Sequence, residues 1–365
     1  MMIAHRIALK PNNRQRTYFA KACGVARLAY NWGLVAWQQQ YQAHKENPDN
    51  PKPTAMLLHR QLNAIKRDKF PFMLEVTKCA PQQALKHLGY AFKNFWTGRA
   101  KYPQFRKKGH RDSFYISNDQ FKIAGSRIKI PNLGWVRMAE NVRFSGKIMS
   151  ATVSRVADRW FVSITIDTEI QPKQAENQSA IGVDLGVSSL ATLSNGERMA
   201  GAKPYSALLN RLKRLNRSLS RKTKGSKNRE KAKRKLARLH AKIKNIRQDH
   251  LHKLTTKLAQ KYQAIAIEDL NVKGMMKNRR LARSVVDMGF FEFRRQLAYK
   301  VALRGGTLVV ADRWFASSKL CSCCGFKMEK MPLSVRSWQC PQCRAQHDRD
   351  VNAAKNLRNY AFKQL

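Results

Sequence analysis

Alternating hydrophobic and polar residues predict a small all-β region that is assembled from two parts of the chain. One alternating run lies within residues 1–10. In residues 106–170 the period of two returns in several short runs, which turn at Gly125-Ser126 and at Ala157-Asp158-Arg159 as hairpins do. Together these strands predict a small β-barrel.

Residues 11–105 follow a helical pattern, and we expect them to be a helical region inserted into the barrel. Breaks that contain proline, at residues 47–51 and 69–71, divide the region into several helices. Aromatic residues recur there at helical spacing. We expect most of them in the core, with stacking on nucleic-acid bases as the alternative for single rings. They include Tyr30, Trp32, Trp37, Tyr90, Phe92, Phe95 and Trp96.

The second half of the chain predicts an α/β domain, residues 181–365, after a polar linker at residues 171–180. Two apolar runs predict buried strands, and a helix and a third strand follow them. The strands are expected at residues 181–186, 262–269 and 307–310, and the helix at residues 289–304.

Residues 203–261, between the first two of these strands, predict a basic helical hairpin. They contain 21 Lys or Arg and two acidic residues in 59 positions. Two apolar seams on either side of a breaker at residues 223–226 indicate two helices that pack together. The first seam is Leu208, Leu212, Leu215 and Leu219, and the second is Leu236, Leu239, Ile243 and Ile246.

The composition indicates a protein that binds a polyanion rather than an ordinary metabolic enzyme. The 365 residues include 71 Lys and Arg against 23 Asp and Glu, a formal net charge of +48. Such self-repulsion disfavours a compact fold unless a polyanion shares the charge, so we expect a nucleic acid as partner and no small-molecule substrate. The hairpin could be a solvated face, but charge of nearly one sign favours phosphate contacts. The candidate contacts are Lys231, Lys233, Arg234 and Lys235.

The chain lacks the signals of a membrane or secreted protein. No apolar run approaches the roughly 18 to 20 residues of a membrane helix, and the amino terminus has no secretory hydrophobic segment. We therefore expect a cytoplasmic protein of a prokaryote, associated with the nucleoid and not with a membrane.

Three acidic residues stand out against the basic background. Asp184 lies within the apolar strand 181–186, and Glu268 ends the apolar run 265–267. A carboxylate in a buried strand needs a cation, a donor network or an open site. Asp350 lies in a predicted first helical turn, where capping and the helix dipole are an alternative explanation.

Carboxylate oxygens from several elements suit Mg²⁺ or Mn²⁺, and two such ions can activate a water and stabilise a leaving oxygen of a phosphodiester. The Gly182-x-Asp184-x-Gly186 motif alone is weak, since sugar kinases and actin-like ATPases also use it. Its combination with extreme basicity favours a polynucleotide substrate. No Walker motif occurs, and no Ser-His-Asp or Cys-His arrangement is indicated.

Five of the seven cysteines crowd near the carboxyl terminus and predict a zinc finger at residues 317–347. Two Cys-x2-Cys pairs, separated by 15 residues, have the spacing of a zinc ribbon. Four thiolates close the coordination sphere, so we expect one structural zinc. Cys323 is surplus, and its ligation in place of Cys324 is the less favoured alternative. The expected ligands are Cys321, Cys324, Cys340 and Cys343.

The sequence resembles the TnpB (OrfB) proteins that bacterial insertion sequences encode, which are compact relatives of the type V CRISPR effectors. The residues that carry this resemblance extend over nearly the whole chain and are most specific after residue 181. They are residues 5–34, 181–186, 264–301, 309–325 and 338–357. Departures are slight: Cys323 is extra, and Leu320 stands where a small polar residue is expected.

The resemblance implies an RNA-guided, metal-dependent endonuclease with a RuvC-like, ribonuclease H-type domain. Guide RNA and double-stranded target DNA would be its partners. Asp184, Glu268 and Asp350 match the family's metal-binding acids, and the four cysteines match its zinc finger. The barrel would correspond to a wedge region and the inserted helices to a recognition region, which also read a short DNA motif. Lys78, Gln82 and Gln83 lie in a plausible stretch, but no pattern singles them out.

The alternative is a binding module, either an RNA-guided DNA-binding repressor or an RNA-binding protein that does not cleave. Such a descendant would be free to lose its acids, and all three are present. A ribosomal-type RNA-binding protein would explain the charge but not three acids at the ends of strands and a helix.

Overall fold

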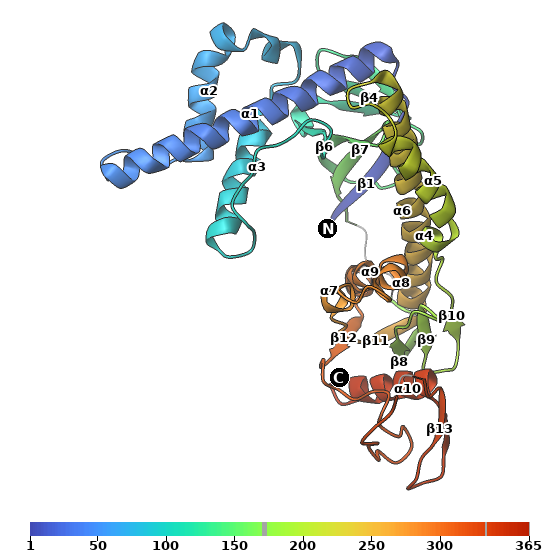
Figure 1. Cartoon of the computed structure of the whole chain (residues 1–365). Coiled ribbons are helices and arrows are strands. Elements are labelled where there is room, and N and C mark those ends of the chain that lie inside the picture. The colour runs from blue at the N-terminus through green and yellow to red at the C-terminus, as the bar shows by residue number, and fades with distance from the viewer. Residues whose placement is uncertain (170–173, 333, 365) are drawn as a thin grey trace. The chain divides into compact units, whose positions relative to one another are not determined.

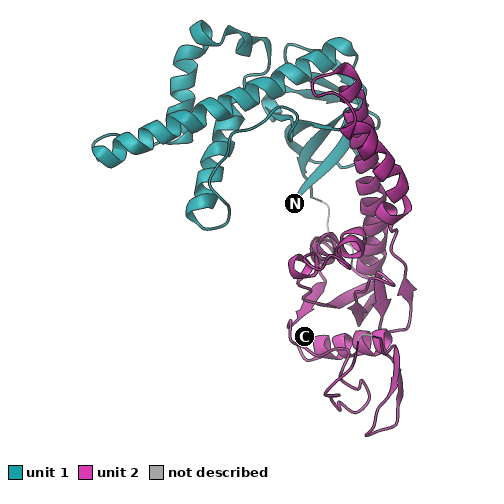
Figure 2. Ribbon diagram, in the orientation of Figure 1, with its two compact units in different colours: residues 1–170 teal, residues 171–365 magenta. Residues whose placement is uncertain are grey.

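The computed structural model describes residues 1–169, 174–332 and 334–364. It divides into two compact units, Met1–Ile170 and Gln171–Leu365 (Figures 1 and 2). Each unit has its own hydrophobic core, and each is described by itself.

The strands of the first unit form two antiparallel sheets. The larger has the order β1-β7-β6-β2 and the smaller the order β3-β4-β5. The bridge between Leu9 and Met138 joins them at one corner. The predicted strands and hairpins are confirmed, but a closed barrel stays a prediction. The strands are β1 (Met2–Leu9), β2 (Ser113–Ser117), β3 (Lys122–Ala124), β4 (Arg127–Ile130), β5 (Gly134–Arg137), β6 (Lys147–Val156) and β7 (Arg159–Asp167).

Three long helices and a short 3-10 helix lie between β1 and β2. They are α1 (Asn13–Glu46), α2 (Ala55–Lys69), η1 (Pro71–Glu75) and α3 (Cys79–Trp96). Asn12 caps α1 by accepting a hydrogen bond from the Gln15 backbone N–H at 2.9 Å, while the Gln15 side-chain oxygen accepts one from the Asn12 N–H. The core of this unit includes residues from both sheets and all three helices, so the helical region and the strands fold together.

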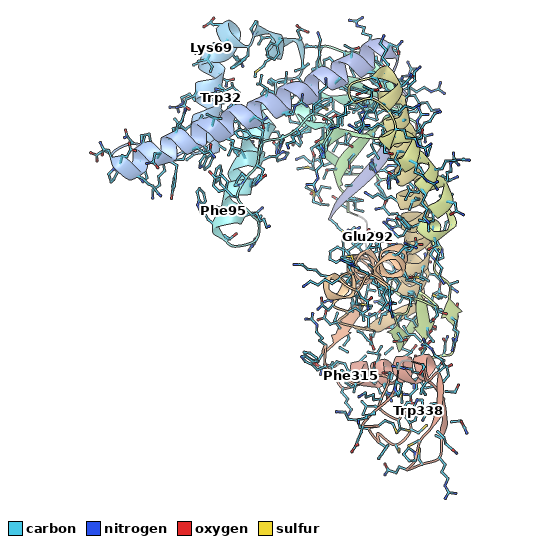
Figure 3. The ribbon with its side chains drawn as sticks, viewed as in Figure 1. Trp32, Lys69, Phe95, Glu292, Phe315 and Trp338 are labelled. Atoms are coloured by element: carbon cyan, nitrogen blue, oxygen red, sulfur yellow. The ribbon has the colours of Figure 1, made fainter. Side chains whose placement is uncertain are left out.

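The aromatic residues of this helical region divide between core and surface. Tyr30, Trp37 and Phe92 are buried, as expected. Tyr90 and Trp96 are instead 62% and 54% exposed, although Trp96 still stacks on Phe92 at 5.4 Å between ring centroids. Phe95 lies close to the end of α3 and packs edge-on against Tyr102 (Figure 3).

The second unit contains a five-stranded mixed sheet of order β10-β9-β8-β11-β12. β8, β11 and β12 are parallel, while β9 and β10 continue the sheet as an antiparallel meander. The strands are β8 (Asn177–Asp184), β9 (Ala191–Leu193), β10 (Arg198–Met199), β11 (Tyr262–Glu268) and β12 (Thr307–Ala311). β8 begins at Asn177, so the predicted linker is too long by four residues, and positions 170–173 lie outside the described residues.

Helices cover both faces of this sheet (Figure 1). The large side chains of β8 and β11 pack against α6, α8 and α9, while the alanines that alternate with them face α10. Such double coverage explains why the parallel strands are apolar on both sides. The helices are α4 (Pro204–Ala207), α5 (Leu209–Ser220), α6 (Lys227–Lys261), α7 (Val272–Met275), α8 (Ala282–Met288), α9 (Phe290–Ala302) and α10 (Arg349–Phe362).

The predicted basic hairpin corresponds to α5 and α6, and Ser226 caps α6 by accepting a bond from the Arg229 N–H. Leu212, Leu239 and Ile243 form its buried contact. Ile246 was expected in this seam, but its side chain is exposed. The cysteine-rich segment before α10 contains the two-stranded sheet β13 (Ser337–Gln339) and β14 (Gln346–Asp348). Among the described residues, no helix is long and apolar enough to cross a membrane.

Candidate active site and metal centre

Asp184 and Glu268 lie side by side at the carboxyl ends of two neighbouring strands. They are the last residues of β8 and β11, and the pairing of Val183 with Ile267 sets the two strands in register. Both acids follow small residues on the α10 face of the sheet. Because side chains alternate along a strand, they point toward the same face as those small residues. The two predicted acids therefore meet at one sheet edge, and both are half-buried.

Helix α10 brings Asp350 to the same place. Its backbone lies directly over Gly182: a Cβ atom there would overlap the carbonyl oxygen of Ala354 and lie 2.6 Å from the backbone nitrogen of Arg358. Asp350 is one helical turn before Ala354, just as Asp184 is one strand repeat after Gly182. Asp348, and not Asp350, caps the helix by accepting a bond from the Val351 N–H at 3.0 Å.

The charges of Glu268 and Asp350 act on Asp184. Burial raises the pKa of Asp184 well above its ordinary value, and the charges of Glu268 and Asp350 raise it further. Burial also raises the pKa of Glu268, against the lowering effects of a hydrogen bond from Ser317 and the charge of Arg349. A bound cation would relieve this repulsion, so the donor set suits a divalent metal ion.

The carboxylates do not close around a single point. Within the described residues, potential ligand atoms of three or more side chains lie within 4.8 Å of one another only in groups formed by cysteines and His347. Two of the acids interact with other side chains of this unit. Ser317 donates a hydrogen bond to Glu268, and a guanidinium nitrogen of Arg336 lies 3.7 Å from Asp350 Oδ1.

Two buried asparagines, which the sequence reasoning missed, fix the segment that contains Ser317. Asn356 Nδ2 donates to the carbonyl of Ser317 at 2.8 Å, and the amides of Asn352 and Asn356 both donate to the carbonyl of Leu320 at 2.7 Å. Both belong to α10, which also carries Asp350. Two asparagines four positions apart in an apolar helical pattern were the available signal, because buried amides need partners.

Two hollows border Glu268. One, of about 570 Å³, is lined by the segments that follow β11 and β12 and includes Trp314 and Lys327. The other, of about 220 Å³, includes Phe291 and Arg294. Both are open to solvent at the carboxyl ends of the parallel strands, where ligand sites of α/β folds occur.

The four predicted zinc ligands converge. The sulfur atoms of Cys321, Cys324, Cys340 and Cys343 all lie within 4.8 Å of one another. The Cys321–Cys343 and Cys324–Cys340 sulfur pairs are each 3.6 Å apart. Tetrahedral coordination with zinc–sulfur bonds of about 2.3 Å places sulfurs about 3.8 Å apart, so the geometry fits the ion.

The two Cys-x2-Cys pairs form the same turn. The Gly325 N–H donates to the carbonyl of Cys321, and the Arg344 N–H donates to the carbonyl of Cys340, each at 2.9 Å. Both residues are left-handed, with φ of 79° and 60°. Glycine adopts this conformation freely because it has no Cβ atom. For Arg344 the same conformation is unfavourable, because it brings the Cβ atom too close to the backbone carbonyl oxygen.

His347 was not predicted, yet it lies beside the cysteine cluster. It is buried, packs against Trp338, and places Nε2 3.0 Å from Cys321 Sγ. Burial acts to raise the pKa of Cys321, but the N–H groups of Cys324 and Cys323 and the His347 ring lower it to about 5. Cys321 and Cys323 also group with His347 within 4.8 Å, which gives the surplus thiol a defined place.

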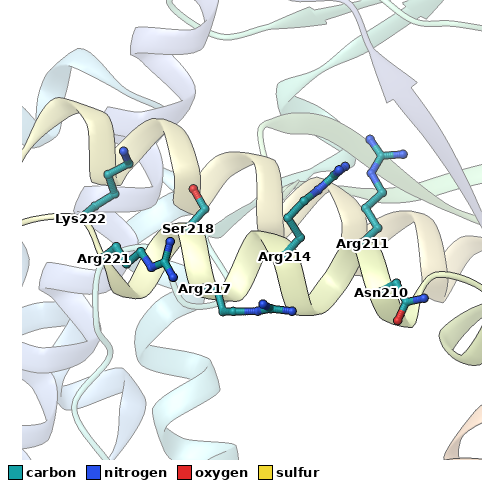
Figure 4. Close-up of a pocket in the computed structure, with 7 residues that line it drawn as sticks. All are labelled: Asn210, Arg211, Arg214, Arg217, Ser218, Arg221 and Lys222. Atoms are coloured by element: carbon teal, nitrogen blue, oxygen red, sulfur yellow. The ribbon is translucent and has the colours of Figure 1, made fainter.

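The predicted phosphate contacts lie on α6, and a second group of cations lies in a hollow beside α5. Lys231, Lys233, Arg234 and Lys235 are all exposed on α6. Arginines three or four residues apart, on α5 and at its C-cap, line a hollow of about 640 Å³ (Figure 4). In the described chain none of these arginines forms an ion pair. The lining residues are Asn210, Arg211, Arg214, Arg217, Ser218, Arg221 and Lys222.

In the first unit, Lys78, Gln82 and Gln83 line one hollow of about 310 Å³ with side chains of β2 and of the short 3-10 helix η2 (Asn118–Gln120) after it. Among these are Tyr115 and Asp119. The structure thus groups three residues that no sequence pattern had singled out.

Comparison with known proteins identifies the family. A Streptomyces pristinaespiralis protein, named as an RNA-guided DNA endonuclease, is 39% identical to this chain. The match covers 97% of this chain and 88% of that protein. The chain belongs to the OrfB (TnpB) family. InsQ of Escherichia coli K12, which is also named as an RNA-guided DNA endonuclease, is 34% identical. The match covers 97% of this chain and 91% of InsQ.

Three family domains match parts of this OrfB chain. The "Probable transposase" domain of OrfB from IS605 matches residues 162–279, and the "Cas12f1-like, TNB domain" matches residues 290–357. A "Helix-turn-helix domain" matches residues 1–46, where the structure has one strand and the single helix α1.

The fold of the chain is similar to that of a protein of solved structure. The protein in the cryo-EM structure of the Cas12f1–sgRNA–target DNA complex matches with a TM-score of 0.55 and 15% identity, over 94% of this chain and 83% of that one. This supports the mixed α/β, multidomain architecture.

Proposed function

We propose that this chain is an RNA-guided, divalent-metal-dependent endonuclease that cleaves double-stranded DNA beside a short flanking motif, encoded within an insertion sequence. The convergence of Asp184, Glu268 and Asp350 at one sheet edge carries the proposal. A protein that only binds nucleic acid has no use for a buried aspartate, Asp184, whose pKa is raised by burial and by two neighbouring acids. The names of its relatives and its charge of +48 support the same activity.

The chain contributes charge and position to the reaction. Asp184, Glu268 and Asp350 would hold magnesium or manganese, and the hollows beside Glu268 would admit the phosphate backbone. Two such ions, when bound, would lower the pKa of a water and stabilise charge that develops on the phosphate. Ser317 orients Glu268 through its hydrogen bond, and α10 keeps Asp350 against β8.

We assign the unit that contains these acids, residues 181–365, to a RuvC-like nuclease domain with a basic hairpin at 203–261 and a zinc finger at 317–347. The mixed sheet with α10 across one face supports this assignment. We assign residues 1–10 and 106–170 to a wedge-like domain. Residues 11–105 would form the recognition region.

The cysteine cluster would hold one structural zinc. The sulfur spacing and the repeated turn support it, and four thiolate ligands leave no open position for catalysis. The two amides of Asn352 and Asn356 would connect this finger to the helix of Asp350.

The basic hairpin would hold RNA through its phosphates. Arginines that line one hollow suit phosphate recognition, because each guanidinium presents several donors in a fixed plane. The exposed α6 residues Lys231, Lys233, Arg234 and Lys235 would add contacts that do not depend on sequence. A protein acting on DNA in this way would work in the cytoplasm, at the nucleoid.

The hollow around Gln82 and Gln83 is the candidate reader of the flanking DNA motif. Glutamine amides can pair with adenine edges through one donor and one acceptor, and Lys78 supplies a further donor. The polar lining of this hollow supports the assignment.

The test is purification of the full chain from cells that carry its own insertion sequence, followed by sequencing of the RNA that copurifies. Cleavage of DNA matching one end of that RNA, lost after ribonuclease treatment, is the expected result. Cutting of arbitrary duplex DNA by RNA-free protein would overturn the guided mechanism and keep the nuclease. Tightly bound RNA without cleavage in Mg²⁺ or Mn²⁺ would favour the alternative, a binding protein.

A further inference from the structure

We propose that Trp314 is a stacking platform for an unpaired base of the DNA strand that the acids cleave. The proposal rests on the proposed nuclease function and adds a base-binding position to it. Trp314 is 87% exposed, the most exposed large hydrophobic side chain in the described part of the chain. Single exposed hydrophobics are common on proteins, so the case depends on where this indole lies and how it is held.

Trp314 lies in the wall of the larger hollow beside Glu268. The same hollow contains Lys319 and Lys327, which can meet phosphates of a strand that enters it, and Arg313, whose charge is paired with Asp269. Sites for single-stranded nucleic acid combine cations, which contact the phosphates, with an aromatic side chain. Such a side chain accepts any base, because every base has a face that can stack.

The segment that carries Trp314 is fixed on both sides of the indole. Before it, Asp312 Oδ1 accepts a bond from the Trp314 N–H at 2.8 Å. Arg313 donates to Asp269 at 2.6 Å, and Arg294 donates to the other oxygen of the same carboxylate. The backbone around the indole is therefore tied to the residue that follows Glu268.

After the indole, the next aromatic side chain turns inward. Phe315 packs against Tyr360 of α10 at 4.9 Å between ring centroids, and Ser317 then donates to Glu268. Of the three aromatic side chains Trp314, Phe315 and Tyr360, only Trp314 is exposed. A ring held in place but unpacked loses little conformational freedom when a base stacks on it, which favours binding.

The occupant we infer is a base of DNA rather than of the guide. Pairing of an RNA with one DNA strand leaves the other strand unpaired, and a strand whose phosphate reaches the three acids presents its neighbouring bases to this hollow. The stacked base would hold that phosphate in position, so Trp314 is a positioning residue and not a catalytic one.

The experiment is a double-mutant cycle between the indole and the base. Single-turnover cleavage is measured for the full chain with its copurified RNA, on target DNA that carries one abasic position at a time near the cut. Wild-type protein should lose roughly 5- to 150-fold in rate at one or two positions. Trp314→Leu should lose a similar factor on intact DNA, with no further loss at those abasic positions.

Trp314→Phe retains an aromatic face and should keep most of the rate. Trp135→Leu, which removes a half-exposed indole of the first unit, is the matched control and should keep both the rate and the abasic sensitivity. The proposal would be overturned if the rate loss of Trp314→Leu multiplied with the loss at every abasic position. It would also be overturned if the only effect of Trp314→Leu were weaker retention of the RNA. Wild-type protein that cuts no matched DNA would instead defeat the nuclease function itself.

Discussion

Gly182 of β8 lies directly beneath Ala354 of α10, so closely that any side chain at position 182 would overlap the helix backbone. This contact sets the distance between the strand that carries Asp184 and the helix that carries Asp350. The small residues of β8 and β11 thus explain how a helix delivers the third acid to the sheet.

Gly182→Ala should push α10 away from the sheet. We expect a loss of about 1–3 kcal/mol in the stability of the second unit, because overpacking against backbone is not relieved by a rotamer change. DNA cleavage should fall at least tenfold. Thermal unfolding and single-turnover cleavage measure the two effects. Gly24→Ala, whose new methyl would meet only the Arg27 side chain at 3.8 Å, is the control and should be neutral. Unchanged cleavage in Gly182→Ala would separate the helix position from activity.

The pattern of this sheet was readable in part from the sequence. Large and small residues alternate up to each acid, in Ala180-Ile181-Gly182-Val183-Asp184 and in Ala264 to Glu268. The large residues face one core and the alanines face α10. Strands, acids and cysteine ligands follow from such local patterns. The contacts of Ser317, His347 and the asparagines do not, because they join segments that only the fold brings together.

The zinc finger should lose its metal when one ligand is removed. Cys340→Ser should lower zinc content from about one per chain and reduce the stability of the carboxyl-terminal region, because metal binding in such clips contributes folding free energy. Metal analysis and limited proteolysis measure this. Cys323→Ser, which alters the surplus thiol, is the matched control and should keep full zinc. Full occupancy in Cys340→Ser, or its loss in Cys323→Ser, would contradict the proposed ligand set.

The arginines of α5 should contribute more to RNA binding than the exposed cations of α6. Replacing Arg211, Arg214, Arg217 and Arg221 by Gln removes four charges, as does replacing Lys231, Lys233, Arg234 and Lys235. The first change should reduce the salt slope of RNA binding by about 3 units, because each lost contact with a single strand lowers the slope by roughly 0.7. The second should weaken matched and mismatched targets equally. An equal or smaller loss of RNA affinity for the α5 variant, measured by filter binding against salt concentration, would contradict this ranking.

Glu292 should stabilise the second unit in a pH-dependent way. Glu292 lies on α9 (Figure 3). Its hydrogen bonds with Arg295, at 2.9 and 2.7 Å, lower the pKa of this carboxyl to about 2. A depressed folded-state pKa gives stability that is complete above the ordinary value of 4.5 and is lost as the pH falls toward 2.

Glu292→Gln should therefore cost about 1 kcal/mol at pH 7, a partly exposed ion pair being worth no more. The difference from wild type should shrink at pH 3, as urea unfolding would show. Glu329→Gln, at an exposed position, should change stability at neither pH. A Glu292→Gln penalty of the same size at both pH values would contradict the assignment of the stabilisation to the charged pair.

The most direct measurement is single-turnover cleavage of DNA that matches the copurified RNA, in Mg²⁺, by wild type and by Asp184→Ala, Glu268→Ala and Asp350→Ala. Each substitution should abolish cleavage and leave RNA and DNA binding nearly intact, and double variants should be no worse than single ones, since the acids act as one unit. Asp249→Asn removes one exposed carboxylate from α6 and should cut at the wild-type rate. A triad variant that keeps most of its metal-dependent rate would contradict the assigned active site.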